Sequence, residues 1–340
     1  MGRRRLAPTL RHRGDPRRPA VPGASGAISS ADMTHVFIAP HPDDVALSCG
    51  GLVARLRERG QRVAIVTVFS GGARADGAAG LSEYQRAALG FGNGAPVPAT
   101  AGSRQGDAPL DLSAADIARV RSSEDERYAD MTGCSVVRLD LPDAVYRGYE
   151  GDAELLGAVR DDDPPPYEAV LGRVLRLDPQ MVYAPLGVGS HVDHQLCREV
   201  ALALLDAARG PAAPAPGSPG RAAPAPGFPG RAARARGFAG RVSFYEDFPY
   251  AWRHDFHAPA ELPGGGLALP SGFALEARYT DIGEQLDRKA AGIAQYESQV
   301  ARLFESERGM LDALAAYHGR VAAEGGIAGY AERCWVAVPL

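Results

Sequence analysis

Residues 34–69 read THVFIAPHPDDVALSCGGLVARLRERGQRVAIVTVF and contain two apolar runs on either side of a helical pattern. The runs at 34–39 and 62–69 are rich in β-branched residues, which is typical of strands that are buried on both faces of a parallel sheet. Between the runs, apolar residues recur at helical spacing up to Gly60. A strand, a helix and a second strand in this order predict a βαβ unit.

The same alternation continues along the chain, so we expect a Rossmann-like α/β fold with a mostly parallel sheet flanked by helices. Residues 70–110 are rich in Gly, Ala and Asp and are predicted to form a long loop at the carboxyl end of a strand. The further elements that the pattern predicts are helices at 113–132 and 167–177, a loop and then a helix within 191–208, strands at 135–139, 181–184 and 242–246, helical spacing over 281–318, and a final edge strand at 334–338.

Two segments depart from this pattern. Residues 1–32 are predicted to be a disordered or non-native extension. Residues 209–241 nearly repeat the unit APAPGSPGRAA as APAPGFPGRAA, and such a composition cannot bury enough apolar surface to offset the entropy of ordering. We therefore expect one domain over residues 33–340, interrupted by a flexible insertion at 209–241.

Charge is unevenly distributed within a formal net charge of −4. Residues 1–32 hold seven arginines and two aspartates, and residues 209–241 hold six arginines and no acidic residue. The rest of the chain has 24 basic and 39 acidic residues. Nucleic acids and anionic membranes require clustered positive charge, so we expect neither as the main partner.

The four cysteines are widely spaced and form no CxxC motif, which argues against a disulfide scaffold or a thiolate zinc knuckle. No run approaches the roughly 18 apolar residues of a membrane span. The arginine-rich start lacks the apolar core of a secretory signal, while a transit peptide and an alternative start at Met33 both stay open. We expect a cytoplasmic protein, and the sequence leaves open whether it forms a homo-oligomer.

Two polar clusters, HPDD at 41–44 and HVDH at 191–194, each follow a predicted strand. The carboxyl ends of strands in an open parallel sheet face one crevice, so clusters 150 positions apart can meet there. Together they offer the imidazole and carboxylate ligands that suit zinc, whose catalytic sites use three protein ligands and leave a position for water.

Each cluster alone also has a structural explanation. His-Pro-Asp-Asp after a strand is commonly a turn with an aspartate helix cap. Two histidines and an acid within four residues, in contrast, are costly to bury without a purpose. The occurrence of both clusters at matching topological positions favours function.

The clusters, together with RSSED at 121–125 and LPD at 141–143, resemble the PIG-L/LmbE family of zinc-dependent N-acetylglucosaminyl deacetylases. The resemblance runs from about residue 34 to residue 200 and resumes at FYEDFPYA, residues 244–251. It therefore covers most of the chain.

The resemblance implies a role for most members of the two clusters. By similarity, His41, Asp44 and His194 bind zinc, Asp43 is the general base, and a protonated His191 stabilises the oxyanion. Some family members carry a tyrosine just before the second cluster, and this chain has none there. His191 or Asp43 is then left to return the proton to the leaving amine.

Further candidates keep two interpretations each. Asp193 either orients an imidazole or caps a helix. By resemblance, Arg121 lies near the sugar or an anionic substituent and Asp143 accepts hydrogen bonds from hydroxyls; the alternatives are a helix-surface ion pair with Glu124 or Asp125, and a turn-forming aspartate. The run at 245–250 is typical of sugar contacts, with packing as an equal explanation.

These observations predict zinc-dependent hydrolysis of the acetamide of an N-acetylglucosamine-type sugar in a small glycoside, such as one from natural-product or thiol biosynthesis, releasing acetate and a free amine. The expected partner is this small N-acetylated amino sugar, and the expected cofactor is zinc. The alternatives are a metal-dependent hydrolase of another amide or ester and a catalytically silent sugar-binding relative. A dinucleotide-binding enzyme is disfavoured because Gly50 and Gly51 lack the GxGxxG spacing.

Overall fold

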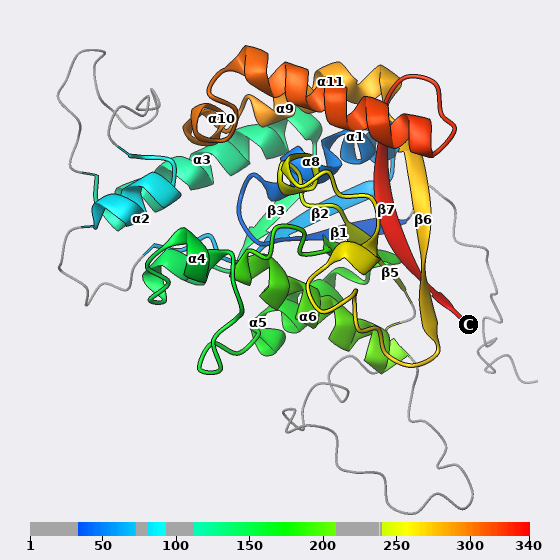
Figure 1. Ribbon diagram of the computed structural model, residues 1–340, viewed down its shortest axis with the longest axis horizontal. Helices are drawn as coiled ribbons and strands as arrows, with labels where there is room; N and C mark the ends of the chain where they lie inside the picture. Colours follow the sequence, from blue (N-terminus) through cyan, green and yellow to red (C-terminus); the bar gives the residue numbers. More distant parts are fainter. Residues whose placement is uncertain (1–32, 73–80, 93–111, 209–237, 239) are drawn as a thin grey trace, which may run out of the picture.

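A seven-stranded sheet forms the centre of the computed structural model, which describes residues 33–72, 81–92, 112–208, 238 and 240–340 (Figure 1). The strand order is β3-β2-β1-β4-β5-β7-β6. The first five strands in the chain pair in parallel, and the last two pair antiparallel. The strands are β1 (Thr34–Ala39), β2 (Arg62–Thr67), β3 (Ser135–Arg138), β4 (Met181–Pro185), β5 (Arg241–Tyr245), β6 (Phe273–Asp281) and β7 (Ala331–Pro339).

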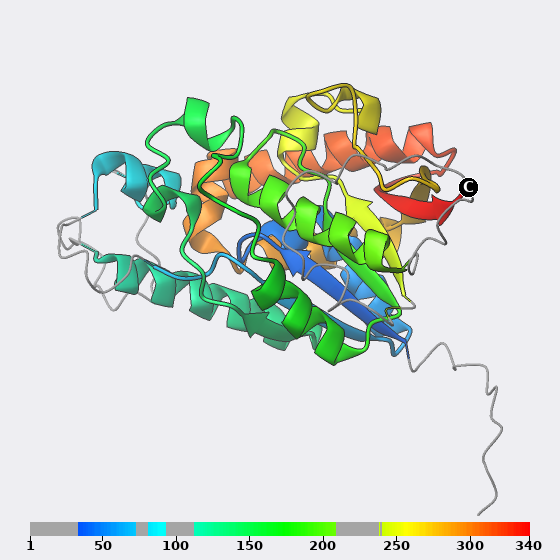
Figure 2. The same cartoon turned by 90° about the horizontal axis from the view of Figure 1, so that it is seen from below.

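The central strands are buried because helices cover both faces of the sheet. All six residues of β1 and all five of β4 are buried, which explains their continuous apolar runs. The helices on one face are α1 (Asp44–Glu58), α3 (Ala114–Thr132), α9 (Leu286–Ile293), α10 (Glu297–Phe304) and α11 (Glu307–Glu324), and those on the other are α5 (Tyr167–Val174) and α6 (Val192–Ala208) (Figures 1 and 2).

The predicted α/β fold and its principal elements are confirmed. Helix α3 begins and ends where the sequence indicates: the Ser113 hydroxyl accepts a hydrogen bond from the Asp116 amide in a capping box, and Gly133 adopts the left-handed conformation at the C-cap. Shorter helices α2 (Glu83–Ala88), α4 (Asp152–Leu155) and α8 (Tyr250–Arg253) lie in segments without a strong periodic signal.

Three expectations were wrong in detail. The C-terminal strand is not at an edge, because β6, which the pattern did not predict, pairs with it along its whole length and takes the edge position. The helical spacing over 281–318 is divided among three helices, α9 to α11. The predicted loop at 70–110 contains α2 within its described part.

The extension at 1–32 and nearly all of the insertion at 209–241 lie outside the described residues, so the predicted domain division stays a prediction. The described chain leaves α6 at residue 208 and resumes with β5 at residue 241. All four cysteines are free. Among the described residues, no helix has the length and apolar character needed to cross a bilayer.

Candidate metal centre and active site

The two polar clusters meet at the middle of the sheet. Strands β1 and β4 are neighbours, and the chain order reverses between them: β2 and β3 lie on one side, β4 and β5 on the other. Ligands of open α/β sheets bind in the crevice that forms at such a reversal, outside the carboxyl ends of the strands. His41 follows the end of β1, and His191 directly precedes α6, which carries Asp193 and His194.

A buried His/Asp triad lies in this crevice. Ligand atoms of His41, Asp44 and His194 all lie within 4.8 Å of one another. The Asp44 carboxylate is central, because Oδ2 lies 3.3 Å from His41 Nδ1 and Oδ1 lies 3.5 Å from His194 Nε2. The three residues are at most 7% exposed. Two imidazoles and one carboxylate form a three-ligand set that fits a catalytic zinc ion.

A second group, His41, His191 and Asp193, also satisfies this distance criterion. Its carboxylate, however, is already fully engaged: Oδ2 accepts from the Ala144 amide and lies 2.9 Å from His41 Nε2, while Oδ1 accepts from Arg147. The triad around Asp44 is therefore the better candidate for holding a metal ion.

The electrostatics of the triad favour a bound cation. Burial alone lowers the pKa of His41, but the carboxylates of Asp143, Asp193 and Asp44 outweigh burial and raise this pKa to about 10. Burial likewise opposes ionisation of Asp44, yet His194 and His41 hold its pKa well below the usual range. In the absence of metal, a proton on an imidazole compensates the negative charge of the surrounding carboxylates. A divalent cation can replace that proton.

Asp43 lies beside the triad without belonging to it. Its Oδ1 accepts a hydrogen bond of 3.0 Å from Arg121 Nη2, and the residue is 6% exposed. Asp43 occupies the N-cap position of α1, but its side chain makes no capping hydrogen bond. The carboxylate is thus turned away from the helix end and oriented by the guanidinium, so the alternative of a simple helix cap does not apply.

Arg121 and Asp143 also reach the site. Arg121 is buried, and its carboxylate partners are Asp43 and, at 3.8 Å, Asp143. The alternative prediction, an ion pair with Glu124 or Asp125 on the helix surface, is therefore wrong. Asp143 does accept a turn-forming hydrogen bond, from the amide two residues later, through Oδ1. Its Oδ2 faces His41 Nε2 at 3.5 Å, so both interpretations of Asp143 hold together.

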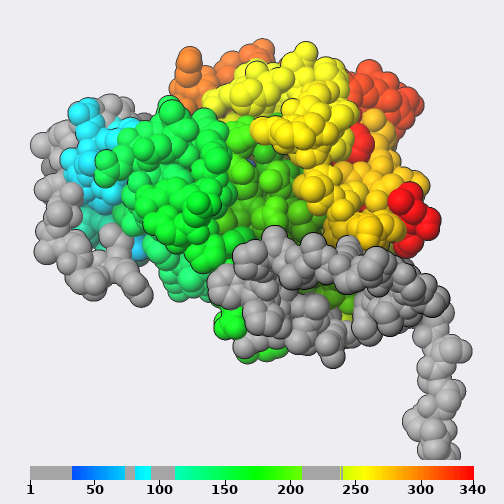
Figure 3. Space-filling view, turned by 60° about the horizontal axis from the view of Figure 1, so that its bottom comes forward, coloured from blue at the N-terminus to red at the C-terminus, as the bar shows by residue number. Residues whose placement is uncertain are grey.

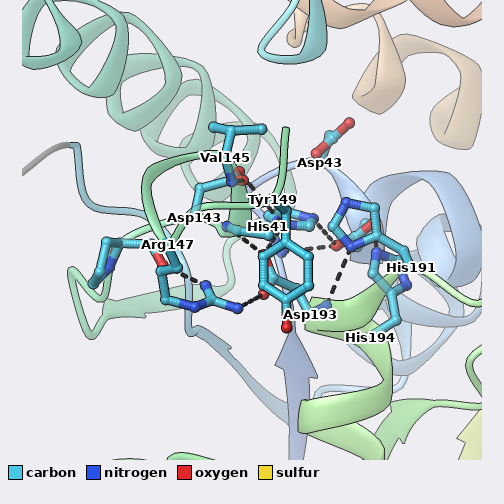
Figure 4. A network of polar contacts seen from close by, with 12 residues as sticks. His41, Asp43, Asp143, Val145, Arg147, Tyr149, His191, Asp193 and His194 are labelled. Carbon is cyan, nitrogen blue, oxygen red and sulfur yellow. Dashed lines mark hydrogen bonds and ion pairs between the residues drawn. The ribbon is translucent and has the colours of Figure 1, made fainter. Parts of the chain in front are cut away.

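Asp193 links His41 to a charged network (Figure 4). Its carboxylate lies between His41 Nε2, at 2.9 Å, and Arg147 Nη2, at 2.5 Å. Arg147 also contacts Asp163 through Nε and Nη2, and its guanidinium stacks on Phe69, 4.6 Å from the ring centroid. Asp193 is fully buried and follows the first residue of α6, and its carboxylate contacts the His41 imidazole instead of capping the helix.

His191 differs from expectation in its charge. The backbone amide of Asp193 donates a hydrogen bond of 3.2 Å to His191 Nδ1, which must therefore lack a proton. Burial and the neighbouring His41 and His194 lower the pKa of His191 well below its ordinary value. Both observations favour a neutral His191 imidazole that is protonated at Nε2, in place of the expected protonated ring.

His194 contacts a carboxylate from another part of the chain. Asp247 follows β5, and its Oδ1 lies 2.6 Å from His194 Nδ1. In the run at 245–250, Phe248, Pro249 and Tyr250 line the cavity described below, while Tyr245 and Glu246 are buried by packing. Asp247 belongs to the run that was expected to contact sugar or to pack, and it contacts a histidine instead; no sequence pattern pointed to Arg147.

A cavity opens above these groups. Its polar floor includes the triad with Asp43, Arg121, Asp143 and His191, and its walls include the apolar side chains Leu155, Phe248, Tyr250 and Leu303. On the surface, the segments around residues 150–170 and 245–265 lie on either side of α6 (Figure 3). Of the eight predicted site residues, all except Asp193 line the cavity, and Asp193 lies behind His41.

Comparison with known proteins gives consistent matches. A family model described as PIG-L, GlcNAc-PI de-N-acetylase, matches residues 36–205. A 2'-N-acetylparomamine deacetylase of Streptomyces fradiae is 30% identical over 223 residues, which cover 65% of this chain and 58% of that protein's length. The 2'-N-acetylparomamine deacetylase of Niallia circulans is 25% identical, and the match covers 80% of this chain and 82% of that protein.

Solved structures share the fold. The zinc-inhibited form of the teicoplanin deacetylase Orf2 matches with a TM-score of 0.58 and 23% identity, over 91% of this chain and 99% of that one. The A40926 pseudoaglycone deacetylase Dbv21 matches with a TM-score of 0.55 and 24% identity, over 90% of this chain and 97% of that one. With half of its length matched by the family model, the chain belongs to the PIG-L family of de-N-acetylases, which are amide hydrolases.

Proposed function

We propose that this protein is a zinc-dependent deacetylase that hydrolyses the acetamide of an N-acetylated amino sugar in a small glycoside. The observation that carries the proposal is the buried triad of His41, Asp44 and His194 at the base of the cavity, with the Asp43 carboxylate beside it. The aminoglycoside deacetylases that resemble the chain act on substrates of this class, which supports the assignment.

The donor set suits zinc, and His41, Asp44 and His194 are the residues that would hold it. When bound, zinc supplies a Lewis acid that acidifies water and polarises an amide carbonyl. An amide is a poor electrophile, so both effects are needed for hydrolysis at neutral pH.

Asp43 is proposed as the general base. Its carboxylate lines the cavity and is held by Arg121, so it is positioned to accept the proton of the attacking water. The same carboxyl group can return this proton to the leaving amine, since no tyrosine precedes the second histidine cluster. His191 presents its Nε2–H as a donor for the developing oxyanion, a role that requires no positive charge on the ring.

Arg121 and Asp143 are proposed to contact the sugar from the polar floor of the cavity. Asp143 offers a carboxylate oxygen that can accept hydroxyl hydrogen bonds, and Arg121 offers guanidinium donors. Apolar walls opposite them suit the less polar face of a sugar ring or its aglycone.

The test is acetate release from a panel of N-acetylated amino sugars and their glycosides, with zinc-loaded wild type and Asp43→Asn. We expect release from at least one glycoside by the wild type and a loss of roughly 10²- to 10⁴-fold in kcat in the variant, the range of general-base catalysis. Zinc content should be equal in both proteins. An Asp43→Asn variant as active as wild type would remove Asp43 as the base, and zinc-loaded wild type that cleaves only other amides or esters would redirect the substrate class.

A further inference from the structure

Asp247 lies outside the stretch of residues 36–205 that the family model matches, yet it reaches the centre of the site. It follows β5, the strand next to β4, so its side chain lies at the same carboxyl edge of the sheet as the second histidine cluster. The residue is 1% exposed. It does not line the cavity, so contact with substrate cannot explain its position.

Both oxygens of the Asp247 carboxylate are engaged. Oδ2 accepts two backbone hydrogen bonds, from the amides of Gly187 at 2.7 Å and Val188 at 2.8 Å. Oδ1 faces His194 Nδ1 at 2.6 Å. The two backbone donors fix the plane of the carboxylate, so only Oδ1 is available to the imidazole.

This arrangement determines where His194 carries its proton. An ionised carboxylate only accepts hydrogen bonds, so Nδ1 of His194 must be the donor. In the neutral ring, the lone pair then lies on Nε2, the nitrogen that faces Asp44 Oδ1 at 3.5 Å. The ring thus presents its free lone pair to the triad.

We propose that Asp247 is a positioning residue that fixes His194 in the Nδ1–H tautomer, so that Nε2 is free to bind the metal ion. The proposal rests on the proposed function, because it assumes that the triad binds zinc. Partners of this kind commonly hold metal-binding histidines, and their loss typically costs 10- to 100-fold in metal affinity or activity.

The adjacent Glu246 provides a matched control. It is 3% exposed, and its carboxylate accepts from Trp335 Nε1 at 2.7 Å and Arg333 Nε at 2.5 Å, with Tyr317 as a third donor. None of these partners is a histidine. A Glu246→Gln variant therefore measures the cost of disturbing a buried carboxylate at this end of β5 without touching the triad.

The decisive variant is Asp247→Asn. The amides of Gly187 and Val188 need an acceptor, so the side-chain oxygen of asparagine must face them and its NH₂ group must face His194. Nδ1 then becomes an acceptor and the proton moves to Nε2, which can no longer bind metal. The substitution keeps the shape and the backbone hydrogen bonds while reversing the tautomer, as in other carboxylate–histidine pairs.

The experiment is zinc affinity by competition with a chromophoric chelator, for wild type, Asp247→Asn and Glu246→Gln. We expect a 10- to 100-fold weaker affinity in Asp247→Asn and an unchanged affinity in Glu246→Gln. Equal affinity in wild type and Asp247→Asn, or an equal loss in both variants, overturns the proposal while leaving the deacetylase function standing. Failure of wild type to bind zinc overturns the proposed function, and this inference with it.

A second measurement needs no folded variant at residue 247. Long-range ¹H–¹⁵N spectra of zinc-loaded wild type, with His194 assigned by its absence in His194→Ala, report which ring nitrogen carries the proton. We expect the proton on Nδ1. A proton on Nε2 would contradict the proposal.

Discussion

His41 and His194 are both held by a buried carboxylate, but the two carboxylates are anchored in different ways. On the His41 side, Asp193 accepts from one backbone amide, that of Ala144, and from the charged side chain of Arg147, which is itself shared with Asp163. On the His194 side, Asp247 depends on two neutral backbone amides.

The two carboxylates are thus held in place by different interactions: an ion pair with one backbone hydrogen bond on the His41 side, and two backbone hydrogen bonds on the His194 side. Charge pairing can be removed by substituting one side chain, and it leaves a buried charge behind when broken. Backbone anchoring depends on the local path of residues 187–190, where Gly189 adopts a φ of +83°. We therefore expect the His41 side to be sensitive to changes of charge and the His194 side to changes of backbone shape.

The largest effect is expected from Asp193→Ala. The substitution removes the acceptor of His41, Arg147 and the Ala144 amide at a fully buried position, so we expect a loss of about 3–5 kcal/mol in the free energy of unfolding. Denaturant unfolding of the metal-free protein measures it. Asp162→Ala, at an exposed ion pair, should leave stability unchanged; an equally small effect at Asp193 would show that the network does not stabilise the site.

A third buried carboxylate provides a further comparison, because Asp125 accepts hydrogen bonds from two neutral hydroxyls, those of Thr67 and Tyr296. Burial raises its pKa from 3.8 to about 7. The folded state therefore binds the proton more tightly than the unfolded state, and stability decreases as pH rises from about 4 to 7, by at most roughly 1.4 kcal/mol per pH unit, and then stays level.

Asp125→Asn removes this titration. The difference in unfolding free energy between variant and wild type should thus grow in favour of the variant over that pH range. Denaturant unfolding at several pH values from 4 to 8 measures the difference. A difference that does not change with pH would show that Asp125 is ionised throughout.

Arg147→Met tests the charge dependence of the His41 side directly. The variant keeps the bulk that packs on Phe69 but leaves Asp193 and Asp163 without their shared cation. We therefore expect the free energy of unfolding to fall by about 2 kcal/mol and the zinc affinity to be roughly tenfold weaker. Unfolding and chelator competition measure the two effects. Arg160→Met, at an exposed arginine of the same loop, should change neither. If both variants behave alike, the ion pair between Asp193 and Arg147 contributes neither to stability nor to zinc affinity.

Gly189→Ala tests the backbone dependence of the His194 side. A Cβ at this position would lie 2.6 Å from the Tyr250 ring, and alanine is disfavoured at this positive φ. We therefore expect the free energy of unfolding to fall by about 1–2 kcal/mol and the KM to rise because Tyr250 is displaced. Gly172→Ala, within α5 and in open space, should be neutral or slightly stabilising. Equal outcomes for both glycines would contradict the role of this turn.

Much of the fold and the main polar clusters follow from the sequence. Apolar runs long enough to be buried on both faces identify β1, β2 and β4, and a parallel sheet then brings the clusters after β1 and β4 together. Strand β6 gave no such signal because it lies at the edge, where its exposed and partly buried residues alternate without a continuous apolar run.

The residues that hold the two histidines in place were harder to predict. Asp247 follows a predicted strand, so the rule that found His41 could have placed it at the same edge, but its aromatic neighbours suggested sugar binding instead. Arg147 lies in an irregular loop after β3, and its contact with Asp193 depends on how that loop folds back. No periodic pattern encodes such a contact.

The central claim is that His41, Asp44 and His194 together hold a zinc ion. Elemental analysis of purified wild type and His194→Ala tests it most directly. We predict close to one zinc per chain in the wild type and a large loss in the variant, with acetate release falling in parallel. Wild type without metal that also fails to take up added zinc, or a variant that retains its full zinc content, would contradict the account.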